Sequence, residues 1–158
     1  MSVLPLAEPW LSDEEVEAVT AVVRSGWLTM GARTERFENE FAAKVGVPYA
    51  VMVSSCSAAL QLTFAALGLG PGDEVIVPSL TFVATANAVA HTGATPVFAD
   101  IVSAERPLMD PEAVRALVGP HTRAICTVHY AGYIGGMDDL RALATRHSLA
   151  LIEDAAQA

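Results

Sequence analysis

Lysine is almost missing from this sequence, and charged residues are few. The 158 residues include nine Lys and Arg, of which Lys44 is the only lysine, against eighteen Asp and Glu. The formal net charge is −9 at pH 7. An acidic surface gains nothing from nucleic acid or from an anionic membrane, so we expect neither as a main partner. A small anionic ligand stays open, because backbone amides can bind it whatever the global charge.

Cysteine and long apolar runs are also scarce. Cys56 and Cys126 are the only cysteines, with neither CxxC spacing nor a disulfide framework. No apolar stretch approaches the ~20 residues that span a bilayer. The opening segment, residues 1–17, turns acidic at once and has no basic region typical of a signal peptide. No metal-ligand spacing, no G-x-G-x-x-G after a strand and no P-loop lysine is found. We therefore expect a cytoplasmic protein without a metal, nicotinamide or ATP motif.

Apolar residues, in contrast, make up 53 % of the chain, which is enough for a large core. A capping box from Ser12 to Glu15 opens one amphipathic helix, which Gly26 ends, and a second is expected over about residues 33–44. From residue 49 onward, short apolar strands alternate with helices. This pattern is typical of an α/β fold with a mainly parallel sheet and helices on both faces. The strands are expected at 49–53, 74–77, 95–100, 123–128 and 149–153, and the helices after them at 57–67, 82–91, 111–118 and 137–147.

Ligands of open α/β sheets bind beyond the carboxyl ends of the strands, so the residues there are the candidates for a site. Ser57 and Ala58 follow the first strand, where the free amides of a helix N-terminus favour an anion. The plainer interpretation is that Ser55 or Ser57 is only an N-cap. Cys56 is either a thiol whose pKa the helix N-terminus lowers or a small filler residue.

Four more residues lie at or just beyond strand ends. Phe82 is either a stacking surface for a flat ligand or a core residue. Asp154 either keeps a ring nitrogen protonated or caps a following helix, and Gln157 would lie one helical turn further on. His129 is either an acid, base or ligand, or a satisfied histidine beside Tyr130.

Together these segments resemble the DegT/DnrJ/StrS family of pyridoxal-phosphate-dependent nucleotide-sugar aminotransferases. The matching motifs run in family order along nearly the whole chain. The two most specific are GPGDEVIVPSLTFVATANA (70–88) and EDAAQA (153–158). The resemblance implies that pyridoxal 5′-phosphate is the cofactor. Its phosphate would be held by Ser57 and the amide of Ala58, its ring would stack on Phe82, its ring nitrogen would pair with Asp154, and its phenolic oxygen would bond to Gln157.

The resemblance also implies where this chain belongs in a longer enzyme. Residues 1–158 would form an N-terminal segment and an incomplete large domain of fold-type-I aminotransferases. The Schiff-base lysine of the family lies beyond EDAAQA, and Lys44 matches no lysine motif, so this segment is expected to hold no catalytic residue and to be inactive alone. Cys56 stands where many members have Gly.

The function implied is amino transfer, with glutamate as donor, to a keto group of a nucleotide-linked sugar. A homodimer is expected, because family members build their sites from two chains. Two alternatives remain open at this point. One is a pyridoxal-phosphate-dependent sugar dehydratase of the same family, in which another residue replaces the lysine. The other is a non-catalytic binding or regulatory fragment.

Overall fold

The computed structural model describes residues 8–158, which fall into two compact units. One unit ends at Met52 and the other extends from Val53 to Ala158. The expectation about a signal peptide falls partly on residues 1–7, which lie outside the described residues. Across residues 8–158, no helix combines the length and the apolar character that crossing a membrane requires.

The first unit contains two helices, α1 (Asp13–Ser25) and α2 (Ala32–Val45). The capping box predicted for α1 is present: the Glu15 carboxylate accepts a hydrogen bond from the Ser12 amide at 2.6 Å, and the Ser12 hydroxyl accepts one from the first turn. Gly26 ends α1 with a φ of 72°, a left-handed conformation that costs glycine little. Both helices begin and end within a residue of the predicted bounds.

The strand predicted over residues 49–53 is absent, and this prediction was wrong. These residues form no regular structure, and the side chains of Tyr49 and Val51 are 84 % and 76 % exposed. The amide of Met52 donates to the Glu38 carboxylate of α2 at 2.7 Å instead of to a neighbouring strand. A short apolar run has the composition of a buried strand, but it becomes one only where another strand is there to pair with it.

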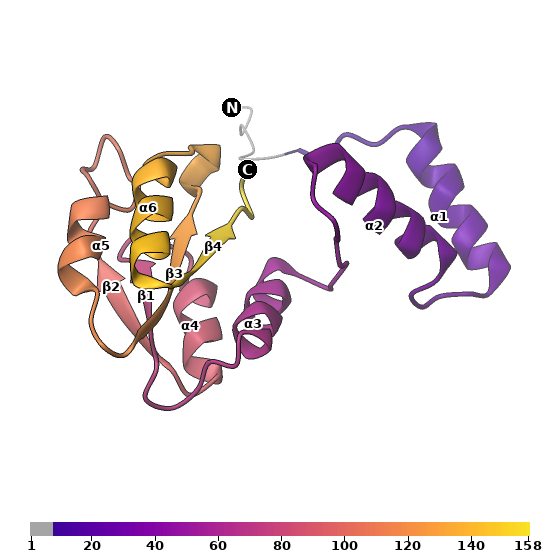
Figure 1. Cartoon of the computed structure of the whole chain (residues 1–158). Coiled ribbons are helices and arrows are strands. Elements are labelled where there is room, and N and C mark those ends of the chain that lie inside the picture. The colour runs from indigo at the N-terminus through magenta and orange to yellow at the C-terminus, as the bar shows by residue number, and fades with distance from the viewer. Residues whose placement is uncertain (1–7) are drawn as a thin grey trace. The chain divides into compact units, whose positions relative to one another are not determined.

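The second unit is a four-stranded parallel sheet with helices on both faces, as the sequence predicts (Figure 1). The strands lie in the order β2-β1-β3-β4, and every neighbouring pair is parallel. The strands are β1 (Glu74–Pro78), β2 (Thr95–Ala99), β3 (Thr122–Val128) and β4 (Ala150–Asp154), and the helices are α3 (Cys56–Ala66), α4 (Val83–His91), α5 (Pro111–Leu117) and α6 (Met137–His147), with a 3₁₀ turn η1 (Tyr130–Gly132) after β3.

Successive residues of the central strands belong to two separate cores. In β1, Val75 and Val77 pack beneath α3 and α4, whereas Ile76 packs on the opposite face beneath α5 and α6. Figure 1 shows these two helix pairs on either side of the sheet. Since side chains alternate along a strand and both faces are covered, both sets must be apolar. This is why the strands appear in the sequence as unbroken apolar runs.

The strand order creates a crevice at the carboxyl ends of β1 and β3. From β1 the chain continues to β2 on one side, while β3 leads to β4 on the other. The connections that leave the carboxyl ends of β1 and β3 therefore diverge, which opens a crevice between them. The segments that follow β1, β3 and β4 all reach this crevice, and they carry the candidate residues.

Candidate functional site

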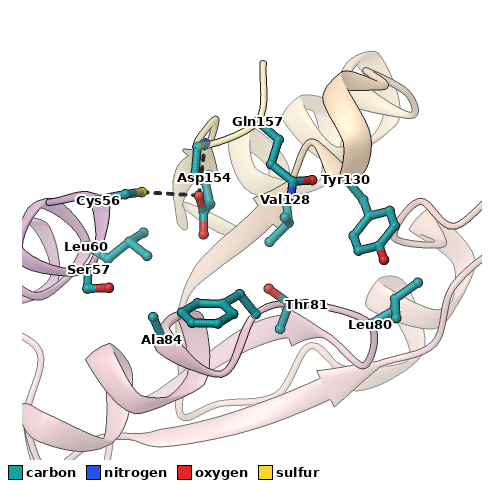
Figure 2. A pocket seen from close by; sticks show the side chains of 12 residues that line it. Cys56, Ser57, Leu60, Leu80, Thr81, Ala84, Val128, Tyr130, Asp154 and Gln157 are labelled. Atoms are coloured by element: carbon teal, nitrogen blue, oxygen red, sulfur yellow. Dashed lines mark hydrogen bonds between the residues drawn. The ribbon is translucent and has the colours of Figure 1, made fainter. Parts of the chain in front are cut away.

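A cavity of about 370 Å³ lies at the carboxyl ends of β1, β3 and β4, within the second unit. Its volume is in the range of small-molecule sites. Figure 2 shows its lining residues, which come from the start of α3, the loop after β1, the end of β3 and the segment after β4. They are Cys56, Ser57, Leu60, Leu80, Thr81, Phe82, Ala84, Val128, Tyr130, Asp154, Ala156 and Gln157.

Asp154 is the charged residue of this cavity, and its side chain is held from three directions. Oδ2 accepts a hydrogen bond from the Thr85 hydroxyl at 2.9 Å. Oδ1 accepts from the Ala156 amide at 3.2 Å and from the Cys56 thiol at 3.3 Å (Figure 2). The residue is only 6 % exposed. Residues 156 and 157, which follow it closely, form a turn.

The carboxylate of Asp154 has hydrogen-bond donors but no cationic partner. Among residues 8–158, none of the ion pairs includes it. Burial of a carboxylate without a counter-ion is costly, so the cavity is suited to a ligand that brings a positive charge or an N–H donor to this position. The remaining walls are largely apolar, with Leu60, Ala84 and Val128 among them. A flat ring with one protonated nitrogen fits this combination.

The N-terminus of α3 forms another side of the cavity. Ser55 is the N-cap of α3, because its hydroxyl accepts a hydrogen bond from the Ala58 amide at 3.2 Å. The plain interpretation of the serines is thus correct for Ser55. Ser57 has no capping role, is exposed, and lines the cavity in the first turn of the helix. The hydroxyl of Ser57 and the amides of this turn are therefore in position for an anion, with Ser55 competing for the amide of Ala58.

The surroundings of Cys56 bear on the two interpretations that the sequence left open for it. Partial burial raises the pKa of the Cys56 thiol, and the hydrogen bond to Asp154 and the negative charge of that carboxylate raise it further. Of the two interpretations that the sequence left open, the raised pKa disfavours a thiol acidified by the helix N-terminus and favours the small filler residue. A thiol that stays protonated can act as a donor to the carboxylate, which is what its 3.3 Å contact shows.

Phe82 is not a core residue. Its side chain is 73 % exposed although it precedes α4 directly, and it lines the cavity together with Ala84 and Thr81. An exposed phenyl ring on a cavity wall offers its face to a flat ligand, and burial under that ligand would remove apolar surface from water. The position thus supports stacking over the alternative of core packing.

Gln157 lines the same cavity as Phe82 and makes one contact with the backbone. Its Oε1 accepts a hydrogen bond from the Ala131 amide at 2.6 Å. An amide N–H can bond only to the oxygen of the side chain, so the orientation of the carboxamide is fixed and Nε2 remains as a donor. Gln157 lines the cavity, and Figure 2 shows its side chain between Asp154 and Tyr130.

His129 does not line the cavity and makes a structural pair instead. It is 3 % exposed, and its Nε2 lies 2.9 Å from Oε2 of Glu153. Glu153 shares its face of β4 with Leu151, which packs beneath α5 and α6, whereas Asp154 points to the other face. The structure thus agrees with a satisfied histidine. The other three histidines, His91, His121 and His147, are exposed.

Two residues of the site were not singled out from the sequence, Thr81 and Thr85. Thr81 lines the cavity, and its hydroxyl lies 2.8 Å from the hydroxyl of Thr85, which is fully buried and donates to Asp154. The signal that could have found them is the pair of threonines four residues apart at the point where β1 has ended and α4 begins. Across residues 8–158, no cluster of His, Cys, Asp and Glu side chains is arranged to hold a metal ion.

The parallel sheet and the cavity at its switch point define an α/β domain with a cavity suited to a small ligand beyond the carboxyl ends of its strands. Residues 9–158 match the model of the DegT/DnrJ/EryC1/StrS aminotransferase family, and the chain belongs to this family.

Known proteins similar to this chain agree with that assignment. This chain is 50 % identical to the spore coat polysaccharide biosynthesis protein SpsC of Bacillus subtilis (strain 168). The match extends over 156 residues, which are 98 % of this chain and 40 % of SpsC. The structure of DesV from S. venezuelae is 47 % identical and superposes with a TM-score of 0.89, over 92 % of this chain and 39 % of DesV.

A third relative was solved with its cofactor. The PLP form of the putative sugar aminotransferase Spr1654 from Streptococcus pneumoniae is 34 % identical, with a TM-score of 0.84 over 89 % of this chain and 36 % of that one. The solved neighbours are fold-type-I aminotransferases, so the fold class predicted from the sequence is confirmed. The chain spans about 40 % of the length of these relatives.

Proposed function

We propose that this chain forms the cofactor-binding part of a pyridoxal-phosphate-dependent sugar aminotransferase. The observation that supports this most directly is Asp154, a buried carboxylate that faces an apolar-walled cavity and has no cationic partner among residues 8–158. Family membership and the Spr1654 structure in its PLP form point to the same cofactor. We refer below to the protein at its relatives' length as the full-length enzyme.

Four of the five predicted cofactor residues line one cavity, and the fifth, Ala58, follows Ser57 in the first turn of α3. Ser57 and the amide of Ala58 would hold the phosphate at the N-terminus of α3. Phe82 would stack on the ring, and Gln157 would donate from Nε2 to the phenolic oxygen. Asp154 would accept the N–H of the ring nitrogen, and its negative charge would keep that nitrogen protonated.

When bound, pyridoxal phosphate supplies an electron sink for the negative charge left when a proton is removed beside the amino group. The residues of this chain serve that chemistry by position. Asp154 holds a proton at the ring nitrogen, and Phe82 fixes the plane of the ring. Leu60, Val128 and Ala84 exclude water around the carboxylate, which strengthens its interaction with a cation.

The finer parts of the proposal rest on the resemblance to the family. They are that the acceptor sugar is nucleotide-linked, that glutamate is the amino donor, that the enzyme is a cytoplasmic homodimer, and that the catalytic lysine lies in the part of the relatives that this chain does not span. Lys44, in α2, matches no lysine motif of the family. Product analysis with a keto sugar separates amino transfer from dehydration.

The test is Asp154→Asn in the full-length enzyme, followed by single-turnover kinetics with the amino donor. Asn keeps the size of the side chain but removes the charge that keeps the ring protonated. We expect the proton-abstraction step to slow about a thousandfold, equivalent to about 4 kcal/mol in the barrier. The matched control is Asp138→Asn, which removes the same charge at an exposed position in α6 and should leave the rate unchanged.

A thermal melt of each variant completes the test. If Asp154 served only the turn at Ala156, the Asn variant would lose about 1 kcal/mol of stability and keep nearly normal turnover. Wild-type single-turnover rates in Asp154→Asn would therefore refute the cofactor assignment.

A further inference from the structure

Thr85 and Thr81 form a hydrogen-bonded chain that ends on Asp154. The Thr85 hydroxyl donates to Oδ2 of Asp154 at 2.9 Å and lies 2.8 Å from the Thr81 hydroxyl. A hydroxyl has a single hydrogen, and Thr85 uses it on the carboxylate. Thr81 must therefore be the donor to Thr85. The direction of the whole chain is thus fixed, from Thr81 at the cavity wall through Thr85 to Asp154.

Among residues 8–158, the Thr85 hydroxyl hydrogen-bonds only to Thr81 and Asp154. Thr85 is fully buried in the first turn of α4, and its backbone amide bonds to the carbonyl of Phe82. Phe82 is the N-cap residue of α4, and no side chain caps this helix by a hydrogen bond. A valine would fill the same space without burying a hydroxyl, so packing alone does not require threonine here. The contact that does require it is the one with Asp154, which lies 69 residues further along the chain.

The hydrogen bonds to Asp154 also leave one acceptor site of its carboxylate unused. An ionised carboxylate accepts about four hydrogen bonds. Thr85, Cys56 and Ala156 take three of them, from α4, α3 and the turn after β4. Three contacts from separate elements fix the rotation of the carboxylate. One acceptor site remains, and since Asp154 lines the cavity, that site is available to one donor from a ligand.

We propose that Thr85, supported by Thr81, is a positioning residue that holds Oδ2 of Asp154 so that the remaining acceptor site of the carboxylate faces the ring nitrogen of the cofactor. This inference rests on the proposed function. Its consequence is that the orientation of Asp154, and not only its charge, sets how firmly and at what angle the ring is held.

The experiment measures binding of pyridoxamine phosphate to the cofactor-free full-length enzyme, which needs neither the lysine nor turnover. The variants are Thr85→Val, which keeps the volume and removes the hydroxyl, and Thr85→Ser, which keeps the hydroxyl and removes the methyl group. The readouts are the dissociation constant and the circular dichroism of the bound cofactor band, which reports how the ring is fixed. Asp154→Asn is measured beside them.

We expect Thr85→Val to raise the dissociation constant about tenfold or more, the effect of one hydrogen bond to a charged group, and to weaken the cofactor dichroism. Thr85→Ser should stay within about twofold of the wild type in both readouts, because the donor is retained. Thr81→Val should give an intermediate loss of about threefold, since it removes only the outer donor of the chain.

The possible failures are distinguishable. Wild-type affinity and dichroism in Thr85→Val, with weakened binding in Asp154→Asn, would overturn the positioning role and leave the proposed function standing. Unchanged binding in Asp154→Asn, or no binding by the wild type, would overturn the proposed function and this inference together. If Thr85→Val does not fold, the other two variants decide: full affinity in Thr81→Val with a large loss in Thr85→Ser would refute the hydroxyl chain.

Discussion

Cys56 shows how much the neighbours of a residue determine its chemistry. By its place at the N-terminus of α3 it should be an acidified, reactive thiol. Its actual neighbour is the Asp154 carboxylate, and burial together with this negative charge raises the thiol pKa. Cys56 therefore lies as a donor to the Asp154 carboxylate, and its raised pKa disfavours the thiolate.

This raised pKa gives a prediction for alkylation by iodoacetamide, which reacts with the thiolate. A thiol with a raised pKa has a smaller thiolate fraction at pH 8, so Cys56 should react more slowly than a free cysteine and accelerate as the pH rises further. Asp154→Asn removes the negative charge beside the thiol and should speed the reaction at pH 8. Mass spectrometry of the labelled peptides across pH 7–10 measures both effects.

Cys126 provides the internal control for this experiment. Burial raises its pKa even more strongly, and its side chain is inaccessible, so it should be labelled only after unfolding in guanidinium. Faster alkylation of Cys56 than of a free cysteine at pH 7 would show that the helix N-terminus outweighs burial and the carboxylate.

At the scale of elements, the start of α3 separates two serines that look equivalent in the sequence. Ser55 accepts the Ala58 amide as the N-cap, and Ser57 lines the cavity without a capping contact. One serine thus stabilises the helix, and the other is available to a ligand. The two roles are close enough in space that the cap and an anion compete for the amide of Ala58.

We therefore predict opposite results for Ser55→Ala and Ser57→Ala in the full-length enzyme. Ser55→Ala should cost about 1 kcal/mol of stability, the usual loss for an N-cap, and leave the affinity for pyridoxamine phosphate equal or slightly higher. Ser57→Ala should leave the melting temperature nearly unchanged and weaken binding about fivefold to tenfold, as expected for one hydrogen bond to a charged phosphate. Thermal melts and binding titrations distinguish them, and the same pattern in both variants would contradict the division of roles.

At the scale of the whole molecule, the exposed apolar surface is the most unusual feature. In α1, no residue is buried, and the apolar face formed by Val16, Val19 and Val23 is about 60 % exposed at each position. In the described sheet, β4 is an edge strand, since it pairs only with β3. Apolar faces of this size and open strand edges both promote association.

We predict that the 158-residue chain, produced alone, associates or is only partly folded. Sedimentation velocity should show species larger than 16.5 kDa, in proportions that rise with concentration. Val16→Glu combined with Val23→Glu makes the face of α1 polar and should increase the monomer fraction, whereas Glu17→Gln on the same helix should not. A monomer with sharp, reversible and concentration-independent unfolding would contradict this prediction.

The sequence by itself determined the elements and their order. Caps such as Ser12, glycines such as Gly26 and the unbroken apolar strands are local signals, and the helices and the four paired strands follow them to within one or two residues. The sequence also pointed to Ser57, Phe82, Asp154 and Gln157 beyond the strand ends, and these four residues line one cavity because parallel strands bring their carboxyl ends to one edge of the sheet.

Only the tertiary structure decided which interpretation of each residue applies. The run at 49–53 has the composition of a strand but no strand to pair with, and His129 turns to Glu153 on the far face. Phe82 is exposed in the cavity rather than packed in the core. Thr85 donates a hydrogen bond to Asp154, which lies 69 residues further along the chain. Hydrogen bonds, burial and pKa shifts of this kind arise between segments distant in the chain, so no local pattern of residues contains them.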